Sequence, residues 1–285
     1  MTRHKAKLLW AAAHEVAEGP FWDAHGATVS WVDITGGELW QSQLHPWEPS
    51  VVRFDGTLAA AIPRSAGGFV LCLSGEIVLT DPIGAVVSRT TVLTDASLRF
   101  NDAKCDSAGR LWAGTTAVEF TEGGGALYRH DGTTPELVAE GLVLPNGLGW
   151  SPDDTRFYLV DSMRNQILHA AFDAESGKIG ELSVAFKTTG GLPDGLCVDS
   201  TGMLWVAFWG GGVVRQFTPG GRQLASIDVP AQQCSSCCIV NDTLCITTAR
   251  SGLSAEEIAA EPLAGSLFTA AVDGLQGVPL HRAAF

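Results

Sequence analysis

A frame of about forty residues that recurs six times constrains the fold of this sequence more than any other feature. Each copy starts with a short apolar stretch, turns eight residues after its first position, and continues into a stretch rich in β-branched and aromatic residues. The turns fall at positions 26, 67, 109, 154, 202 and 242, which are 41, 42, 45, 48 and 40 residues apart. A period of this size, with several short strands in each copy, is typical of a β-propeller.

The six copies therefore predict an all-β, six-bladed β-propeller whose blades are four-stranded antiparallel sheets. Because the copies follow one another without a linker, we expect residues 1–285 to form a single domain. The composition agrees with this prediction, since 33 Gly and 13 Pro suit many tight turns, and an apolar fraction of 46% supplies a large core.

The two ends of the chain are expected to close the ring. Residues 7–12 precede the first copy and have no partner within it, while the last copy lacks an outermost strand. We expect the N-terminal segment to supply that strand, because closure removes an exposed sheet edge. Helix is expected only at residues 254–260, where Ser254 can act as the N-cap.

The net charge of −13 disfavours nucleic acid and anionic membranes as partners, since both bind clusters of Lys and Arg. The same charge is compatible with binding a cation. No stretch of about 20 apolar residues occurs, and the short apolar stretch at 8–13 is too brief for a membrane helix or a signal peptide. We therefore expect a cytoplasmic protein, and its oligomeric state stays open.

The seven cysteines are odd in number and lie mostly in apolar contexts, as reduced cysteines do when they serve as small core residues. Cys234 and Cys237 form a CxxC spacing, with Cys238 beside them, and such a spacing can indicate zinc or redox chemistry. No second CxxC or Cys/His pair accompanies it, so a buried inner strand is the alternative interpretation.

Four of the six copies begin with an acid or an amide at the same position of the frame: Glu18, Asn101, Asn146 and Asp194. The other two copies have Ala59 and Cys234 there. In a propeller the first strand of each blade lines the central channel, so these positions are expected near one end of it. The loops that follow the second strands, at 116–119, 161–164, 209–212 and 250–253, return to the same end. We expect the functional site there.

Two carboxylates and one amide oxygen, from Glu18, Asp194 and Asn146, suit a hard or borderline divalent cation. The alternative is that polar residues at blade starts only cap turns or bond to loop backbone. None of the seven histidines occupies such a position, which disfavours a His general base or a His-rich zinc site. Asp33 and Asp161, at the ends of second strands, are expected to be structural turn or cap residues.

The motifs around these positions resemble the regucalcin and gluconolactonase family of six-bladed propellers. The resemblance covers almost the whole chain and is carried by Gly19-Pro20, Trp31-Val32-Asp33-Ile34, Arg99-Phe100-Asn101-Asp102, Gly109-Arg110-Leu111-Trp112-Ala113-Gly114-Thr115, Asn146-Gly147, Pro193-Asp194-Gly195 and Thr248-Ala249-Arg250. It implies that Glu18, Asn146 and Asp194 bind one divalent metal and that Asp194 also accepts and donates the proton. It further implies substrate contacts through Arg99, Asn101 and Glu119.

The expected function is therefore the metal-dependent hydrolysis of a sugar lactone, a cyclic ester of an aldonic acid, to the open acid. The cation, whether Ca²⁺, Zn²⁺, Mn²⁺ or Mg²⁺, would polarise the lactone carbonyl, and Asp194 would move the proton. Three alternatives stay open: a phosphotriesterase-like propeller hydrolase, a non-catalytic calcium-binding regulatory protein, and a scaffold propeller that binds partners on its rim.

Overall fold

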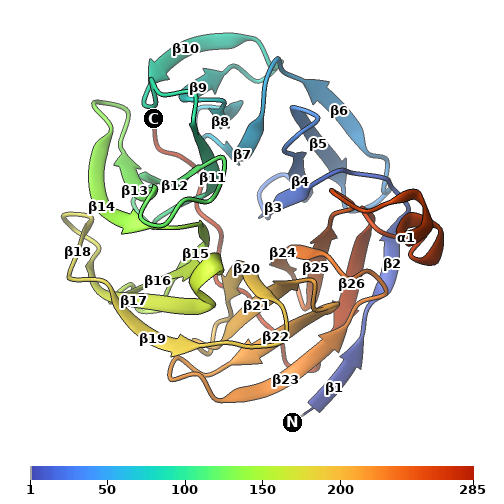
Figure 1. Cartoon of the computed structure of the whole chain (residues 1–285). Coiled ribbons are helices and arrows are strands. Elements are labelled where there is room, and N and C mark those ends of the chain that lie inside the picture. The colour runs from blue at the N-terminus through green and yellow to red at the C-terminus, as the bar shows by residue number, and fades with distance from the viewer. Residues whose placement is uncertain (1) are drawn as a thin grey trace.

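The computed structural model describes residues 2–285 and contains six small sheets, arranged like the blades of a propeller around a common axis (Figure 1). The first strand of each blade lies nearest the axis. These inner strands are β3 (Ala17–Asp23), β7 (Leu58–Pro63), β11 (Leu98–Cys105), β15 (Pro145–Trp150), β20 (Leu192–Val198) and β24 (Cys234–Val240). The predicted all-β, six-bladed propeller is confirmed.

The remaining strands follow the chain outward through each blade. The second strands are β4 (Thr28–Asp33), β8 (Phe69–Leu73), β12 (Leu111–Ala117), β16 (Arg156–Asp161), β21 (Leu204–Trp209) and β25 (Thr243–Thr248). The third strands are β5 (Glu38–Gln43), β9 (Glu76–Thr80), β13 (Gly125–His130), β17 (Gln166–Asp173), β22 (Val213–Phe217) and β26 (Leu267–Ala271). The outer strands are β6 (Ser50–Arg53), β10 (Val86–Thr91), β14 (Glu136–Leu142), β19 (Ser183–Lys187) and β23 (Gln223–Asp228), and the short β18 (Lys178–Ile179) also pairs with β17.

The N-terminal segment closes the ring as expected. Strand β2 (Lys7–Trp10) pairs antiparallel with β26 and is the outer strand of the sixth blade. The preceding strand β1 (Thr2–Lys5) was not expected. It pairs in parallel with β23 and adds a fifth strand to the fifth blade, where Arg3 forms an ion pair with Asp228 at 2.8 Å.

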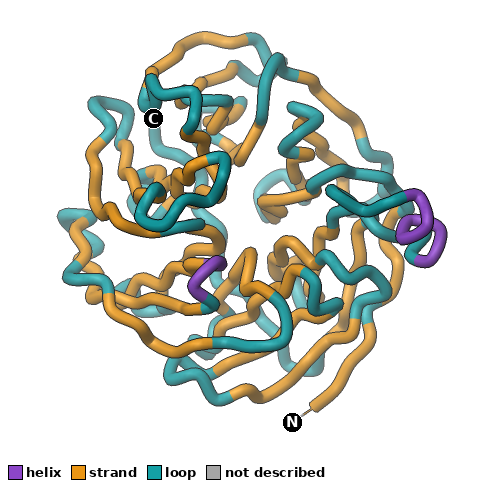
Figure 2. Tube along the Cα trace, in the orientation of Figure 1, coloured by secondary structure: helices purple, strands orange, loops and turns teal. Residues whose placement is uncertain are grey.

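Helix is nearly absent from residues 2–285, as Figure 2 shows. The helix α1 (Ala255–Ala260) confirms the predicted one, and Ser254 caps it in a capping box with Glu257. The other helical turn is the 3₁₀ segment η1 (Ser162–Arg164), in the loop after β16. Within the described chain, no helix has the length and apolar character needed to cross a membrane.

Every inner strand carries a shift of register against the second strand of its blade. The shift lies at or next to the shared first position of the frame, for example between Pro145 and Leu148 and between Pro193 and Leu196. Such a β-bulge places two residues of one strand opposite one residue of its partner and re-aims their side chains. A β-bulge therefore determines the direction of the side chains at the start of the inner strand in all six blades.

The core consists of apolar side chains packed between neighbouring blades. Trp112 and Trp205 occupy equivalent places in the third and fifth blades and are completely buried. Their indole N–H groups donate to Asp106 at 2.9 Å and to Asp199 at 3.0 Å. Because a buried indole N–H needs an acceptor, each tryptophan is fixed together with the turn that follows its inner strand.

The CxxC cysteines lie on the buried inner strand β24, which favours the structural interpretation of that spacing. Cys234, Cys237 and Cys238 are at most 2% exposed, and all seven cysteines are free. The Sγ atom of Cys237 lies 3.7 Å from that of Cys197 on the neighbouring inner strand. Within residues 2–285, no cysteine belongs to a group of three or more side chains with metal-ligand spacing.

Residues 272–285, here called the C-terminal strap, cross the end of the ring opposite the expected site. Gln276 O accepts from Ser200 N in the fifth blade at 2.8 Å, while Ala283 N donates to Pro63 O in the second blade at 2.9 Å. Ala283 is completely buried. The strap passes behind the blades in Figure 1 and links parts of the ring that are far apart in the sequence.

Candidate active site

A cavity of about 390 Å³ lies at the end of the ring where the inner strands begin. Residues from all six blades line it: Val16, Glu18, Ile34, Thr35, Thr57, Arg99, Asn101, Phe120, Leu144, Asn146, Ser162, Met163, Leu192, Asp194, Trp209 and Ser251. The loops after the second strands return to this end as expected, since they supply Ser162, Met163, Trp209 and Ser251. The cavity is therefore the place where inner strands and returning loops meet.

The structure brings together most of the residues that the sequence singles out. Glu18, Asn101, Asn146 and Asp194 all line this cavity and are between 5% and 8% exposed. Arg99 lines it as well. The four residues that occupy the same position of the repeat therefore also line the same cavity.

The glycines that follow Asn146 and Asp194 allow the inner strands to converge. A Cβ atom on Gly147 would lie 2.1 Å from the backbone nitrogen of Leu196, and one on Gly195 would lie 2.0 Å from Ser236 Oγ. Any side chain at either position would force the fourth, fifth and sixth inner strands apart. The pairs Asn-Gly and Asp-Gly thus combine a polar ligand with close backbone contact.

The base of the cavity concentrates buried negative charge. Burial, reinforced by the charge of Asp102, raises the pKa of Glu18 to about 8, although the N–H of Gly19 at 2.7 Å acts in the opposite direction. Burial and the charges of Glu18 and Asp102 also raise the pKa of Asp194 well above its ordinary value. Buried carboxylates that face one another must take up protons or bind a cation.

The donor set fits a divalent cation. The Oδ1 atom of Asp194 is buried and has no hydrogen-bond partner within residues 2–285. The side-chain amide of Asn146 donates to Ser162 Oγ at 3.2 Å, which leaves its oxygen free to act as a ligand. Glu18 supplies the second carboxylate. Carboxylate and amide oxygens of this kind are ligands of hard divalent cations.

Arg99 and Asn101 form one fixed pair on the wall of the cavity. Arg99 Nη1 donates to Asn101 Oδ1 at 2.7 Å and to Phe100 O at 3.0 Å, while Asn101 Nδ2 donates to Pro145 O at 3.0 Å. The guanidinium lies 5.7 Å from the centre of the Phe120 ring. Nε and Nη2 of Arg99 make no hydrogen bond to the described part of the chain, so these donors are free to bind a ligand.

Glu119 differs from the other predicted site residues, because it is exposed and does not line the cavity. It lies in the loop after β12, and the cavity wall at this loop is formed by its neighbour Phe120. Its proposed contact with the substrate stays a prediction.

Two further residues near the cavity were not singled out from the sequence. Asp102 is buried beside Asn101, and burial raises its pKa while the charge of Lys104 lowers it in part. Lys104 has a sequence signal, since it is the one lysine in the six inner strands. Asp102 has a weaker signal, because an acid at a blade start is also a common turn residue.

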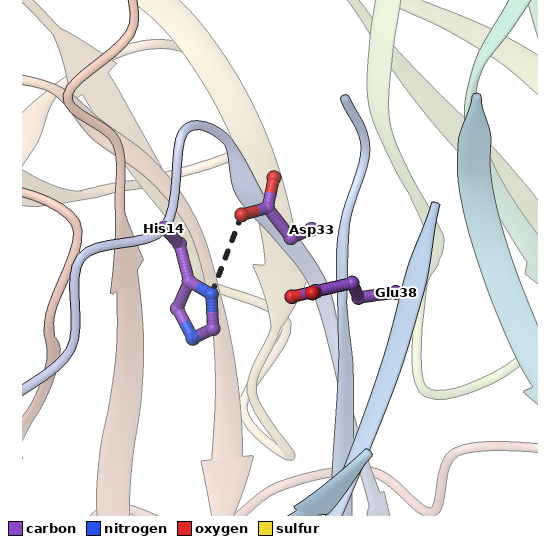
Figure 3. A group of neighbouring side chains, drawn as sticks. All are labelled: His14, Asp33 and Glu38. Atoms are coloured by element: carbon purple, nitrogen blue, oxygen red, sulfur yellow. Dashed lines mark ion pairs between the residues drawn. The ribbon is translucent and has the colours of Figure 1, made fainter. Parts of the chain in front are cut away.

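A second acidic group lies in the first blade, outside the cavity. One ligand atom from each of His14, Asp33 and Glu38 lies within 4.8 Å of the others (Figure 3). Glu38 already accepts from the indole of Trp40 at 2.8 Å and forms an ion pair with Arg53 at 2.8 Å. This carboxylate therefore has its partners within the protein.

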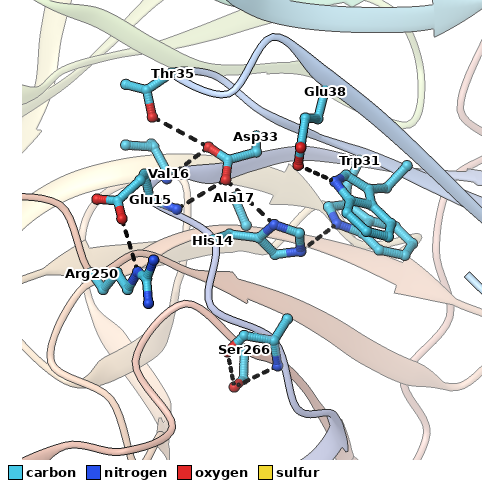
Figure 4. A network of polar contacts seen from close by, with 12 residues as sticks. His14, Glu15, Val16, Ala17, Trp31, Asp33, Thr35, Glu38, Arg250 and Ser266 are labelled. Carbon is cyan, nitrogen blue, oxygen red and sulfur yellow. Dashed lines mark hydrogen bonds and ion pairs between the residues drawn. The ribbon is translucent and has the colours of Figure 1, made fainter. Parts of the chain in front are cut away.

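The other two members of this group are saturated as well (Figure 4). Asp33 accepts from the backbone N–H groups of Glu15 at 2.9 Å and Val16 at 3.1 Å, and His14 Nδ1 lies 3.4 Å from its Oδ2. His14 Nε2 accepts from the indole of Trp31 at 3.2 Å. Since no ligand atom is left free, we interpret the group as a structural network, as was expected for Asp33.

Asp161 occupies the equivalent position in the fourth blade and confirms this structural interpretation. Its side chain accepts from the backbone N–H groups of Val143 at 3.3 Å and Leu144 at 3.1 Å, just before the inner strand of its own blade. Arg164 also pairs with it at 3.3 Å. An aspartate at the end of the second strand thus fixes the entry to the inner strand in both blades.

Comparison with known proteins agrees with this geometry. Residues 16–250 match the model of the family described as SMP-30/Gluconolactonase/LRE-like region. The chain is 34% identical to "Putative sugar lactone lactonase YvrE" of Bacillus subtilis, over 93% of this chain and 94% of the relative. It is 30% identical to regucalcin of Danio rerio over 98% of both chains. Among solved structures, the calcium-binding protein regucalcin from Agrobacterium tumefaciens superposes with a TM-score of 0.91 at 25% identity, covering 100% of this chain and 99% of the other.

Proposed function

The chain belongs to the SMP-30/gluconolactonase/LRE-like family, and we propose that it hydrolyses a sugar lactone to the open acid with one divalent cation. The observation that carries this proposal is the Oδ1 of Asp194, which is buried and has no hydrogen-bond partner within residues 2–285, in a residue that lines a cavity of about 390 Å³. A buried carboxylate oxygen without a donor is costly unless a cation or a proton compensates it.

Glu18, Asn146 and Asp194 would hold the cation. When bound, the cation would act as a Lewis acid that polarises the lactone carbonyl. The all-oxygen donor set favours Ca²⁺, Mg²⁺ or Mn²⁺ over Zn²⁺, which more often takes nitrogen and sulfur ligands. The ordered partners of the ligands support this assignment, since Gly19 N–H fixes Glu18 and Ser162 fixes Asn146.

Asp194 would act as general base and then as general acid. It would accept a proton from the attacking water while the new bond between that oxygen and the carbonyl carbon forms. When the bond between the acyl carbon and the ring oxygen breaks, it would return the proton to that ring oxygen. Its burial beside Glu18 and Asp102 supports this role, because it raises the affinity of Asp194 for a proton.

Arg99 and Asn101 would bind the hydroxyl groups of the substrate, and Glu119 would contribute from the loop after β12. The free Nε and Nη2 donors of Arg99 support this proposal, since a planar guanidinium suits pairs of neighbouring oxygens. Fixing the ring in this way decides which face of the carbonyl meets the water.

The second candidate is a non-catalytic calcium-binding protein. Two observations favour it: the donor set consists of oxygen atoms, and regucalcin from Agrobacterium tumefaciens, which superposes with a TM-score of 0.91, is a calcium-binding protein. This candidate predicts cation binding without turnover of any ester.

One assay separates these candidates. The purified protein is stripped of metal with a chelator and assayed on a panel of pentono- and hexonolactones with Ca²⁺, Mg²⁺, Mn²⁺ or Zn²⁺, and on an organophosphate ester for comparison. We expect release of acid that depends on the added cation and is fastest with a sugar lactone. Cation binding without turnover would support the calcium-binding candidate, and faster turnover of the phosphate ester would overturn the lactonase assignment.

A further inference from the structure

A lysine side chain joins three inner strands behind the candidate active site. Lys104 lies on β11, and its Nζ donates to Leu148 O on β15 and to Leu196 O on β20, both at 2.8 Å. One ammonium group therefore links the third blade, which carries it, to the fourth and fifth blades. An ammonium has three N–H donors, and two of them are used here.

The two carbonyl groups occupy equivalent places in their blades. Leu148 lies two residues after Asn146, and Leu196 lies two residues after Asp194. Each is the first residue of its inner strand that pairs regularly after the β-bulge. Because an inner strand is the edge of its sheet, backbone carbonyls on its free side need a partner from elsewhere. Lys104 supplies that partner at the points that fix the two bulges.

Lys104 does not line the candidate active site. It lines a separate cavity of about 190 Å³, together with Trp150 and with Leu280 of the C-terminal strap. Its hydrogen-bonded contacts are with the strands β15 and β20, which carry Asn146 and Asp194. Lys104 can therefore act on the site in two ways, through these strands or through its charge.

We propose that Lys104 is a positioning residue, which holds β15 and β20 so that Asn146 and Asp194 present their oxygens to one cation. This inference rests on the cation site proposed above. Without the two hydrogen bonds, both bulges would lose the partner that fixes them, and the two ligands would no longer share one arrangement.

A role as a mere positive charge makes the opposite prediction. Lys104 lies near the carboxylates of Glu18 and Asp102 and offsets part of their charge. If charge were its whole contribution, removing the ammonium would leave the site more negative and would tighten cation binding. If Lys104 positions the ligands, its removal weakens cation binding. The sign of the change therefore separates the two roles.

The test is a calorimetric titration of Ca²⁺ into metal-free wild-type protein and into Lys104→Met, which keeps most of the length of the apolar side chain without the donors. We expect the affinity of the variant to fall by roughly tenfold to a hundredfold, the range for groups that orient metal ligands. Ile239→Val is the matched control, because Ile239 lines the same cavity of about 190 Å³ as Lys104 and the change also loosens packing. Its melting temperature should fall while its Ca²⁺ affinity stays at the wild-type value.

An unchanged or tighter affinity in Lys104→Met would overturn the positioning role and leave the cation site intact. A wild-type protein that binds no Ca²⁺, Mg²⁺ or Mn²⁺ would overturn the cation site and this inference together. Should Lys104→Met not fold, Lys104→Arg takes its place, because it keeps the charge but replaces the compact ammonium by a longer, planar guanidinium that does not reproduce one nitrogen 2.8 Å from both carbonyl groups. Weaker Ca²⁺ binding by Lys104→Arg then supports positioning, and unchanged binding overturns it.

Discussion

Glu18 and Asp33 lie on adjacent strands of the first blade, yet their environments are opposite. Glu18 is paired in register with Val32, the neighbour of Asp33, and both carboxylates are 5% exposed. Burial raises the pKa of Glu18 to about 8. Burial would also raise the pKa of Asp33, but hydrogen bonds from His14 and from two backbone N–H groups outweigh it and lower the pKa.

The difference lies in the number of donors that each carboxylate receives. Asp33 accepts from the backbone of Glu15 and Val16 and lies beside His14, so its charge is stabilised by the protein itself. Glu18 accepts one backbone N–H and a side-chain hydrogen bond from Ser236, and it faces the charge of Asp102. Burial alone therefore does not identify a ligand. The useful criterion is a buried carboxylate that has few donors and has other carboxylates around it.

The largest effect is expected at Asp194, whose buried Oδ1 has no hydrogen-bond partner among the described residues. Asp194→Asn keeps the shape and one oxygen but cannot accept a proton, so kcat should fall by about 10²- to 10⁴-fold, the contribution of a general base. The melting temperature of the metal-free variant should not fall, because a charge facing Glu18 and Asp102 is removed. Steady-state kinetics and thermal unfolding measure both results. Retention of most of the activity would exclude Asp194 from the mechanism.

Glu18→Gln tests whether Glu18 is a ligand of the proposed cation. A charge lost at about 4 Å from a cation is worth about 1–4 kcal/mol between water and a protein surface. Cation affinity, measured by calorimetry, should therefore fall by roughly tenfold or more. An unchanged dissociation constant would show that Glu18 is not a ligand.

Asp33→Asn is the corresponding change at the structural carboxylate, and we expect it to lower stability without changing cation affinity. An asparagine amide that replaces one carboxylate oxygen leaves a backbone N–H without its acceptor, which costs about 1–3 kcal/mol. The free energy of unfolding, measured with urea, should fall by this amount while the cation dissociation constant stays unchanged. A weaker cation affinity in this variant would contradict the separation between the two groups.

The two carboxylates also predict opposite dependences of stability on pH. The pKa of Asp33 is lowered by folding, so its stabilisation is present above its unfolded pKa and is lost as the pH falls through its folded pKa. The pKa of Glu18 is raised to about 8, so the metal-free protein should lose stability as the pH rises from about 4.5 to about 8. Urea unfolding with a chelator at pH 5 and pH 8 measures this slope, and saturating Ca²⁺ or Glu18→Gln should reduce it. A slope that neither change affects would assign it to other groups.

The smallest effect concerns substrate hydroxyls. Arg99→Lys keeps the charge but loses the planar arrangement of donors, and one lost hydrogen bond costs about 1 kcal/mol. The value of kcat/KM should fall by roughly fivefold for a polyhydroxylated lactone and stay nearly constant for an unsubstituted lactone. Equal losses on both substrates would mean that Arg99 acts on the carbonyl or on folding.

The sequence predicts those parts of the molecule that follow from its period. The common phase of Glu18, Asn101, Asn146 and Asp194 was enough to place them at one end of the ring, because each blade repeats the same path. The N-terminal strand of the sixth blade was predictable for a related reason, since an incomplete blade requires a partner.

The parts that were missed depend on contacts between distant segments. Strand β1 is polar and pairs in parallel with β23, some 220 residues away, so no local sequence pattern predicts it. The reach of Lys104 to Leu148 and Leu196 depends on the distance across the axis, which the period does not encode. The prediction for Glu119 rests mainly on the resemblance, and the cavity at that loop is lined by Phe120.

The β-bulges of the inner strands have a consequence for the design of new enzymes on this scaffold. The bulge is present even in the blades whose first position holds Ala59 or Cys234, so it does not depend on a polar residue there. Each blade thus has one position, at the bulge of its inner strand, where the residue varies between blades while the pairing of the sheet is kept. Ala59 and Cys234 are buried and do not line the substrate cavity, so a carboxylate or an imidazole introduced at either position would first need room between the inner strands to reach the cation.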